Sequence, residues 1–214
     1  MQPSGSTLAP AGRSRCRFGP LEIEFDQRVL TPRPWTLVQS EWAAELAATA
    51  PSGPLLELCA GAGQIGLLAA RLSGRALVQV EADPVAVRYA AANAERAGLA
   101  AAVELRRARL ETALAPDERF PIVLADPPYL RSADTARWPA DPPAAIDGGP
   151  DGLALIRACL DVAARALPAG GALLLQVAGP AQAQLVATLA GAPFHAESIR
   201  VTDPERAVQL LRRR

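Results

Sequence analysis

Hydrophobic residues follow two different periods along this chain, and the two periods alternate from residue 55 onward. Short apolar runs, typical of buried strands, are followed by segments with the three-to-four-residue spacing of helices. The predicted strands cover 55–59, 76–80, 103–105, 122–125 and 172–177, and the predicted helices cover 65–72, 84–97 and 153–167. Such alternation predicts an α/β fold with a doubly wound, mostly parallel sheet that helices cover on both faces. Residues 198–201 and 207–211 predict a closing antiparallel pair, which makes seven strands in all.

The first fifty residues have a different pattern. Residues 1–15 are rich in Ser, Gly and Pro, and we expect them to form a mobile tail. Apolar and polar residues alternate over 18–30, which predicts a small hairpin, and helical spacing over 35–50 predicts a helix. We therefore expect a single domain over 16–214, in which this hairpin and helix (16–50) precede a catalytic core (51–214).

Composition limits the classes of function. With 214 residues and 50% hydrophobic content, the chain can bury one sizeable core. The formal net charge is zero, so no overall basic field supports binding to nucleic acid. The three cysteines are widely spaced and lack the pairing typical of zinc sites, and the sequence has neither a signal peptide nor a membrane span. We therefore expect a cytoplasmic protein without a metal site or a membrane partner.

A glycine-rich turn joins the first core strand to the first core helix, with the sequence Glu57-Leu58-Cys59-Ala60-Gly61-Ala62-Gly63. Glycine at 61 and 63 lets the backbone approach a ligand, and the helix N-terminus adds unpaired N–H groups. Glu81 and Ala82 follow the second strand, where the Glu81 carboxylate suits ribose hydroxyls. We expect Cys59, Ala60, Gly61, Gly63, Glu81 and Ala82 to bind a cofactor, and these residues alone fit a dinucleotide or S-adenosylmethionine.

The sequence Asp126-Pro127-Pro128-Tyr129, called the clamp below, directly follows the strand predicted at 122–125. Open α/β sheets bind their ligands at such strand ends. The prolines hold the backbone extended and lack N–H donors, so the Asp126 carboxylate and the Pro127 carbonyl can both accept from an –NH2 group. The Tyr129 ring offers a flat face to a planar amide or base. We interpret the clamp as the site of a planar nitrogen, with an ordinary Pro-Pro turn as the alternative.

Three features favour S-adenosylmethionine over a dinucleotide. Glu57 precedes the glycines and suits an ammonium group, the chain is too short for a separate substrate domain, and a nicotinamide has no use for the clamp. The predicted reaction is methyl transfer to nitrogen, with Asp126, Pro127 and Tyr129 as catalytic residues and Pro128 as a further substrate contact. A dinucleotide-dependent oxidoreductase and a non-catalytic subunit of the same fold are the alternatives from other classes.

Taken together, these motifs resemble class I methyltransferases of the HemK type, which methylate the side-chain amide nitrogen of glutamine in peptide release factors. The resemblance runs from about Phe18 to the C-terminus and includes, besides the turn and the clamp, residues 29–34, 81–84, 91–94, 144–153 and 202–208. It implies a Rossmann-like methyltransferase sheet, a cytoplasmic enzyme, S-adenosylmethionine as cofactor, and a clamp that binds the accepting amide.

The sequence departs from that family in three ways. We expect the N-terminal helical domain, which helps to recognise the release factor, to be missing. Asp126 stands where the family usually has Asn, and because ionised Asp only accepts hydrogen bonds, it suits an amino group better than a carboxamide. Trp35 stands where the family commonly has an acid, and Arg109 replaces the acid expected near adenine. We expect Arg109 at that position, and Asp126 of the clamp, to contact the cofactor as well. The methyl acceptor therefore stays open between a protein glutamine, a nucleic acid base and a small-molecule amine.

Two features outside the motifs bear on substrate binding. Arg33 is a candidate substrate contact, with a structural ion pair as the alternative. A long Pro-rich connection that contains Trp138 follows the clamp. Connections of this length in compact folds are often lids, which favours Trp138 as a residue that covers the substrate over a surface anchor.

Overall fold

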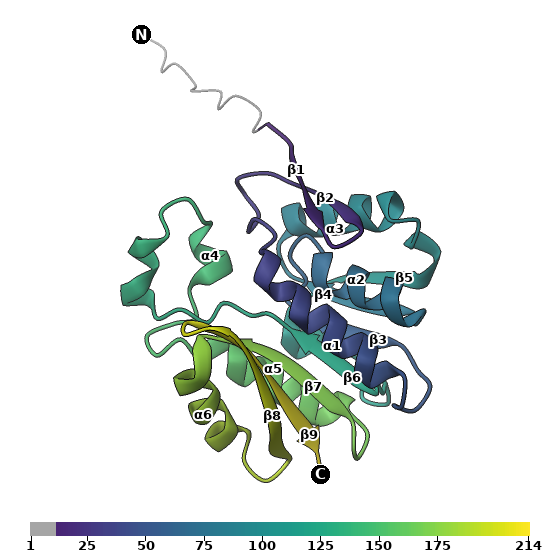
Figure 1. Cartoon of the computed structure of the whole chain (residues 1–214), viewed down its shortest axis with the longest axis vertical. Coiled ribbons are helices and arrows are strands. Elements are labelled where there is room, and N and C mark those ends of the chain that lie inside the picture. The colour runs from purple at the N-terminus through teal and green to yellow at the C-terminus, as the bar shows by residue number, and fades with distance from the viewer. Residues whose placement is uncertain (1–11) are drawn as a thin grey trace.

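The computed structural model describes residues 12–214 and contains a seven-stranded sheet in the order β5-β4-β3-β6-β7-β9-β8 (Figure 1). Its parallel strands are β3 (Leu55–Leu58), β4 (Leu77–Glu81), β5 (Val103–Arg107), β6 (Ile122–Ala125) and β7 (Ala172–Val177). β9 (Arg206–Arg213) pairs antiparallel with β7, and β8 (Phe194–Asp203) pairs antiparallel with β9 at the edge of the sheet. The predicted seven-stranded, mostly parallel α/β sheet with a closing antiparallel pair is confirmed.

Helices cover both faces of this sheet. One face packs against α1 (Leu37–Ala47), α2 (Gln64–Ser73) and α3 (Pro84–Arg96), and the other packs against α5 (Ala154–Ala166) and α6 (Gly179–Ala190). Every residue of β3, β6 and β7 is buried, because a parallel strand between two helical layers has no solvent-facing side. The short elements are η1 (Pro34–Thr36), η2 (Ala100–Ala102), η3 (Leu110–Thr112), η4 (Ser132–Arg137) and α4 (Pro143–Ile146).

Several boundaries differ from the sequence prediction, and the largest differences lie in the first fifty residues and in β8, which begins at Phe194 rather than at residue 198. β1 (Ser14–Phe18) pairs with β2 (Leu21–Phe25), so the expected tail boundary at residue 15 lies inside a strand, whereas residues 1–11 lie outside the described part. Gly19, with φ of 57°, makes the hairpin turn earlier than expected. α1 ends at Ala47 rather than at residue 50. The sequence analysis did not predict α6, because the alanines and glutamines of this helix give only a weak apolar stripe.

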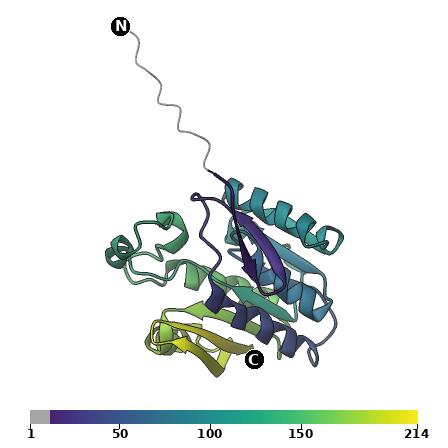
Figure 2. The ribbon, with the colours of Figure 1, turned by 45° about the horizontal axis from the view of Figure 1, so that its top comes forward.

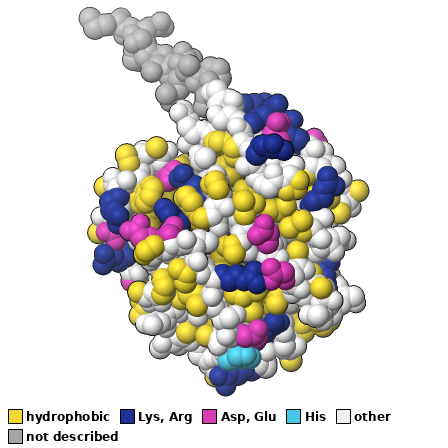
Figure 3. All heavy atoms as spheres, in the orientation of Figure 1, with side chains coloured by type: hydrophobic (Ala, Val, Ile, Leu, Met, Phe, Trp, Pro, Cys, Tyr) yellow, Lys and Arg dark blue, Asp and Glu magenta, His cyan; other side chains and the backbone are white. Residues whose placement is uncertain are grey.

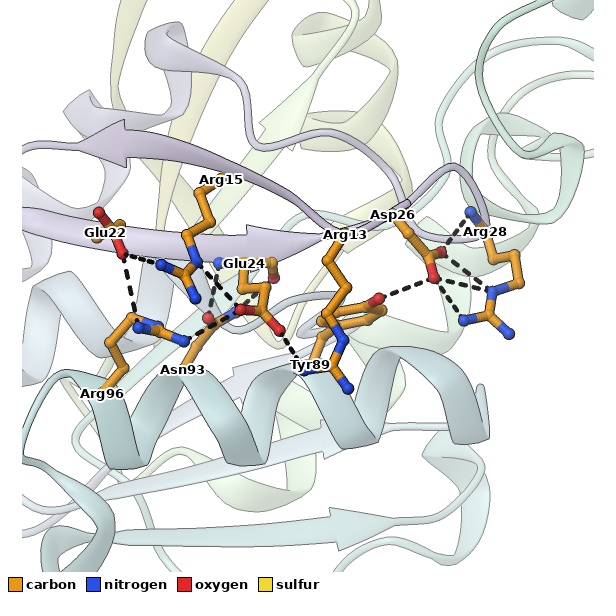
Figure 4. A network of polar contacts seen from close by, with 9 residues as sticks. All are labelled: Arg13, Arg15, Glu22, Glu24, Asp26, Arg28, Tyr89, Asn93 and Arg96. Atoms are coloured by element: carbon orange, nitrogen blue, oxygen red, sulfur yellow. Dashed lines mark hydrogen bonds and ion pairs between the residues drawn. The ribbon is translucent and has the colours of Figure 1, made fainter. Parts of the chain in front are cut away.

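The hairpin is fastened to α3 by buried polar contacts, which Figure 4 shows. The Asn93 amide donates to the carbonyls of Glu24 and Ala62, and its Oδ1 accepts from the Glu24 N–H at 2.8 Å. The Tyr89 hydroxyl donates to the buried Asp26 carboxylate at 2.7 Å, and Arg28 also pairs with that carboxylate. Asn93 therefore ties the hairpin to the glycine turn, since Ala62 belongs to that turn.

The chain order across the sheet creates the ligand crevice. From β3 the chain runs outward to β4 and β5, and it then returns to the other side of β3 as β6. The carboxyl ends of β3 and β6 therefore lie where the direction of winding reverses, which is where open α/β sheets bind ligands. The glycine turn follows β3, and the clamp follows β6. No helix within residues 12–214 is long and apolar enough to cross a membrane.

Candidate functional site

The glycine turn presents an open backbone at the end of β3. Gly61 has φ of 56° and Gly63 has φ of 85°, so both occupy the left-handed region that favours glycine. A Cβ on Gly63 would lie 2.8 Å from Nε2 of Gln79, whereas a Cβ on Gly61 would meet nothing within 4 Å. A side chain at position 63 would therefore collide with the interior of the fold. Gly61 instead lines a cavity, and the absence of a side chain there keeps that part of the cavity open.

Glu81 ends β4 and fixes the outer side of this turn. Its Oε2 accepts from the Gly61 N–H at 2.8 Å, and its Oε1 accepts from the N–H groups of Ala82 and Asp83. A carboxylate has about four acceptor positions, so Oε2 retains one for a ligand hydroxyl in the cavity that Glu81 lines.

Glu57 lies beneath the turn rather than in front of it. Its carboxylate is buried, with Oε1 accepting from the Gly66 N–H at 2.9 Å and Oε2 accepting from the Gln79 amide at 2.6 Å. Burial raises the pKa of Glu57 to about 7. Glu57 is not among the residues that line the two cavities described below, so this carboxylate supports the turn and the start of α2 from inside the fold.

The first cavity, called the cofactor cavity below, has a volume of about 490 Å³ and lies in front of the turn. Of the residues predicted to bind the cofactor, those that line it are Cys59, Ala60, Gly61, Glu81, Ala82, Arg109 and Asp126. The Arg109 side chain is 82% exposed and lies 3.6 Å from Glu111, which lines the same cavity. An acid is thus present two residues after the position where the resemblance predicts it.

The clamp extends from the end of β6 into the space between the helical layers. Burial raises the pKa of Asp126 to about 7. Within residues 12–214, we find no hydrogen bond to the Asp126 carboxylate or to the Pro127 carbonyl. Two acceptors at a strand end therefore have no partner in the fold, which is the arrangement that an –NH2 group would complete.

The second cavity, called the acceptor cavity below, also has a volume of about 490 Å³ and contains the whole clamp. Its aromatic wall consists of Tyr129, Trp35 and Trp138, and its polar wall includes Arg33 and Arg206. Asp126 and Pro128 line both cavities, so the clamp is the boundary between the two spaces.

Two arginines that line the acceptor cavity already interact with other side chains of the protein. The Arg33 guanidinium pairs with both carboxylate oxygens of Asp141 at 2.5 Å. The Arg206 guanidinium stacks 3.8 Å from the centre of the Trp35 ring and pairs with Asp203 at 2.7 Å. Trp138 lines the acceptor cavity, and its role in covering a substrate stays a prediction. Arg33 forms a structural ion pair, which was the alternative to a substrate contact.

Sequence reasoning missed two residues that shape the clamp. The Gln182 amide of α6 donates to the Tyr129 carbonyl at 2.9 Å, and a Cβ on Gly148 would lie 2.7 Å from the Pro128 carbonyl. Gly148 lies in residues 144–153, which carry part of the family resemblance, so the sequence offered a signal for its importance. Gln182 had none, because the helix that carries it was not predicted.

Comparisons with known proteins agree with this geometry. The structure matches the crystal structure of a methyltransferase from Pyrococcus furiosus with a TM-score of 0.67 at 16% identity, covering 91% of this chain and 89% of the other. The fold is therefore that of the class I methyltransferases. The family described as "Conserved hypothetical protein 95" matches residues 38–137.

The sequence is similar to glutamine methyltransferases. It is 35% identical over 176 residues to the release factor glutamine methyltransferase of Gloeobacter violaceus, covering 78% of this chain and 61% of the relative. It is 32% identical over 170 residues to the ribosomal protein uL3 glutamine methyltransferase of Bradyrhizobium diazoefficiens, covering 73% of this chain and 53% of the relative. The resemblance to the HemK type is thus confirmed, and the chain spans between about half and three fifths of these relatives' length.

Proposed function

We propose that this chain is an S-adenosylmethionine-dependent N-methyltransferase that acts on a planar amide or amino nitrogen held by the clamp. The observation that carries the proposal is the shared wall of the two cavities. The residues that line both the cofactor cavity and the acceptor cavity are Leu30, Asp126, Pro128 and Ala145, so the two cavities adjoin beside the clamp and two ligands can approach each other there. The similarity to glutamine methyltransferases supports this type of reaction.

The residues of the cofactor cavity fit S-adenosylmethionine. Oε2 of Glu81 has a free acceptor position for a ribose hydroxyl, and Gly61 presents backbone without a side chain. The volume of about 490 Å³ lies within the range of small-ligand sites. When bound, this cofactor supplies a methyl group that its sulfonium already activates.

The chain's own contribution is to position and desolvate the acceptor nitrogen. The Asp126 carboxylate and the Pro127 carbonyl accept hydrogen bonds from its N–H groups, while the Tyr129 ring packs on the planar group. These bonds orient the nitrogen toward the cofactor cavity and stabilise the positive charge that develops on it. Asp126, whose pKa burial raises to about 7, can then take the proton that the nitrogen releases.

The Asp126 carboxylate favours a second candidate acceptor, an exocyclic amino group of a nucleic acid base. Above about pH 7, where Asp126 is mainly ionised, its carboxylate accepts but does not donate, so it matches an amino group and lacks the donor that a carboxamide oxygen needs. Asp126→Asn separates the candidates. It should keep or improve turnover of a carboxamide and reduce turnover of an exocyclic amine.

A labelling experiment tests the proposed reaction. Extract from cells that lack the protein is incubated with the purified chain and methyl-labelled S-adenosylmethionine, and the label is traced to protein, RNA, DNA or small molecules. We expect label in one of these fractions and far less of it with Asp126→Ala, which should still bind S-adenosylhomocysteine. Loss of one preorganised interaction lowers the rate by roughly a hundredfold, or about 3 kcal/mol. Undiminished labelling by Asp126→Ala would refute the role of the clamp.

A further inference from the structure

The loop after the clamp forms a separate lobe beside the sheet. It spans residues 131–147, contains η4 and α4, and projects from the body in both ribbon views (Figures 1 and 2). We call this segment the cover. Its base is closed by hydrogen bonds between the Gly148 N–H and the Leu130 carbonyl at 2.8 Å and between the Leu130 N–H and the Ile146 carbonyl at 3.1 Å. Both ends of the cover are therefore held together at its base, as in a compact loop whose ends lie close to each other.

The cover forms part of both cavities. Trp138 and Asp141 line the acceptor cavity, whereas Pro142 and Ala144 line the cofactor cavity. Most of its residues are exposed or half-buried, and Ile146 is its one buried residue. Figure 3 shows arginine and acidic side chains gathered over this lobe. Because few apolar contacts hold it, its position depends on the polar contacts that it makes with the rest of the protein.

Those polar contacts come mainly from arginines outside the cover. Arg33, before α1, reaches both oxygens of Asp141, and the side chains of this pair are only 26% and 10% exposed. Arg206, at the start of β9, lies 5.9 Å from the centre of the Trp138 ring and also stacks on Trp35. An outer ion pair between Arg137 and Glu205, at 3.3 Å, is well exposed and therefore weak.

We propose that Arg33 is a positioning residue for the proposed methyl transfer, and that its ion pair with Asp141 holds the cover closed over both cavities. This inference rests on the proposed function only for the identity of the ligands that the two cavities bind. When the pair is broken, the cover moves away from the clamp, which admits the acceptor and exposes the reacting nitrogen to water. When the pair is formed, Trp138 and Asp141 complete the acceptor cavity. Arg33 thus acts through Asp141 and does not itself contact the acceptor.

Hydrogen exchange of the peptides that span 131–147 tests this role directly. Arg33→Ala and Asp141→Ala should each speed exchange of the cover by about fivefold, since this pair is charged on both sides and largely buried, and one guanidinium nitrogen reaches both carboxylate oxygens. Because both substitutions break the same contact, the double variant should exchange no faster than either single one. The reversed pair, Arg33→Glu with Asp141→Arg, should restore most of the protection.

Arg131→Ala is the matched control, because Arg131 lines the same cavity but pairs with Asp134 inside the cover. It should change exchange by much less than Arg33→Ala. Equal effects of the two alanine variants, or additive effects of Arg33→Ala and Asp141→Ala, would overturn the proposal.

A second readout separates failure of this inference from failure of the proposed function. S-adenosylhomocysteine should slow exchange of the Ala144 and Ala145 amides in the unmodified chain, because both residues line the cofactor cavity and the neighbouring Pro142 and Pro143 have no N–H. If it does not, while Arg33→Ala still speeds exchange, the proposed function fails and the role of Arg33 stands. If it does, while Arg33→Ala changes nothing, the role of Arg33 is wrong. Once an acceptor is known, Arg33→Ala should raise KM for the acceptor more than it lowers kcat.

Discussion

Replacing Asp126 by Asn should change how the stability of this protein depends on pH. Burial raises the pKa of Asp126 from its ordinary 3.8 to about 7, because no partner compensates the loss of water around the carboxylate. The protonated form is thus favoured in the folded state and the charged form is penalised. The contribution of Asp126 to the free energy of unfolding is therefore fully present below about pH 4 and is lost as the pH rises through about 7. Asn does not titrate, so the variant lacks this loss.

The size of the effect follows from the shift in pKa. About three units at 1.36 kcal/mol each give about 4 kcal/mol as an upper limit, and water in the open cavity reduces this to between about 2 and 4 kcal/mol. Asp126 also raises the pKa of Glu57 through charge repulsion, so the variant should lower that pKa as well.

Denaturant unfolding of both proteins from about pH 4 to about pH 8 measures the effect. The free energy of unfolding of the unmodified chain minus that of Asp126→Asn should fall by this amount over the range. Asp151→Asn is a control of opposite sign, because the Arg157 side chain and the Leu153 N–H lower the pKa of Asp151. The corresponding difference for Asp151→Asn should stay nearly constant over this range and fall only when the pH drops below about 4. A flat difference for Asp126→Asn would refute the claim that the clamp carboxylate is desolvated and unpartnered.

Further substitutions test the supports of the site. Gly66→Ala should destabilise the fold by about 3 kcal/mol in thermal unfolding, since the new Cβ would lie 2.3 Å from Oε2 of the buried Glu57. Asn93→Ala should speed hydrogen exchange in β1 and β2 and cost about 3 kcal/mol or more, because it leaves the Glu24 N–H and two buried carbonyls without partners. Gln182→Ala should leave binding of S-adenosylhomocysteine unchanged but lower turnover by about tenfold, because the Tyr129 carbonyl loses a hydrogen bond that orients the clamp.

The sequence was sufficient to predict the sheet because its central strands are unusually easy to recognise. The run at β6 is continuously apolar and the run at β7 is interrupted only by Gln176, and strands buried on both faces are typically this apolar. The clamp and the turn were located correctly for the same reason, since each directly follows such a strand. α6 could not be predicted, because alanine-rich segments show little contrast between their faces.

The roles of individual charged residues were harder to predict. Glu57 had the right position in the chain for an ammonium contact, but alternation along β3 turns it toward Gly66 and Gln79 beneath the turn. Arg33 looked like a substrate contact, yet its partner Asp141 is 108 residues away in the sequence. Spacing along a chain carries no information about such distant ion pairs, whereas the sheet topology places both residues at the same cavity.

Binding of S-adenosylhomocysteine by calorimetry tests the central claim most directly, with NADH as the competing ligand. Gly61→Val places a side chain at the cofactor cavity, and Gly74→Val is the matched control, because both glycines have left-handed φ, of 56° and 71°, and no neighbour within 4 Å of a Cβ. Gly74 follows α2 and lines neither cavity. We predict heat from S-adenosylhomocysteine and none from NADH, with affinity lowered about tenfold or more, or 1.4 kcal/mol, by Gly61→Val alone. Heat from NADH and none from S-adenosylhomocysteine would contradict the assignment of this cavity to a methyl donor.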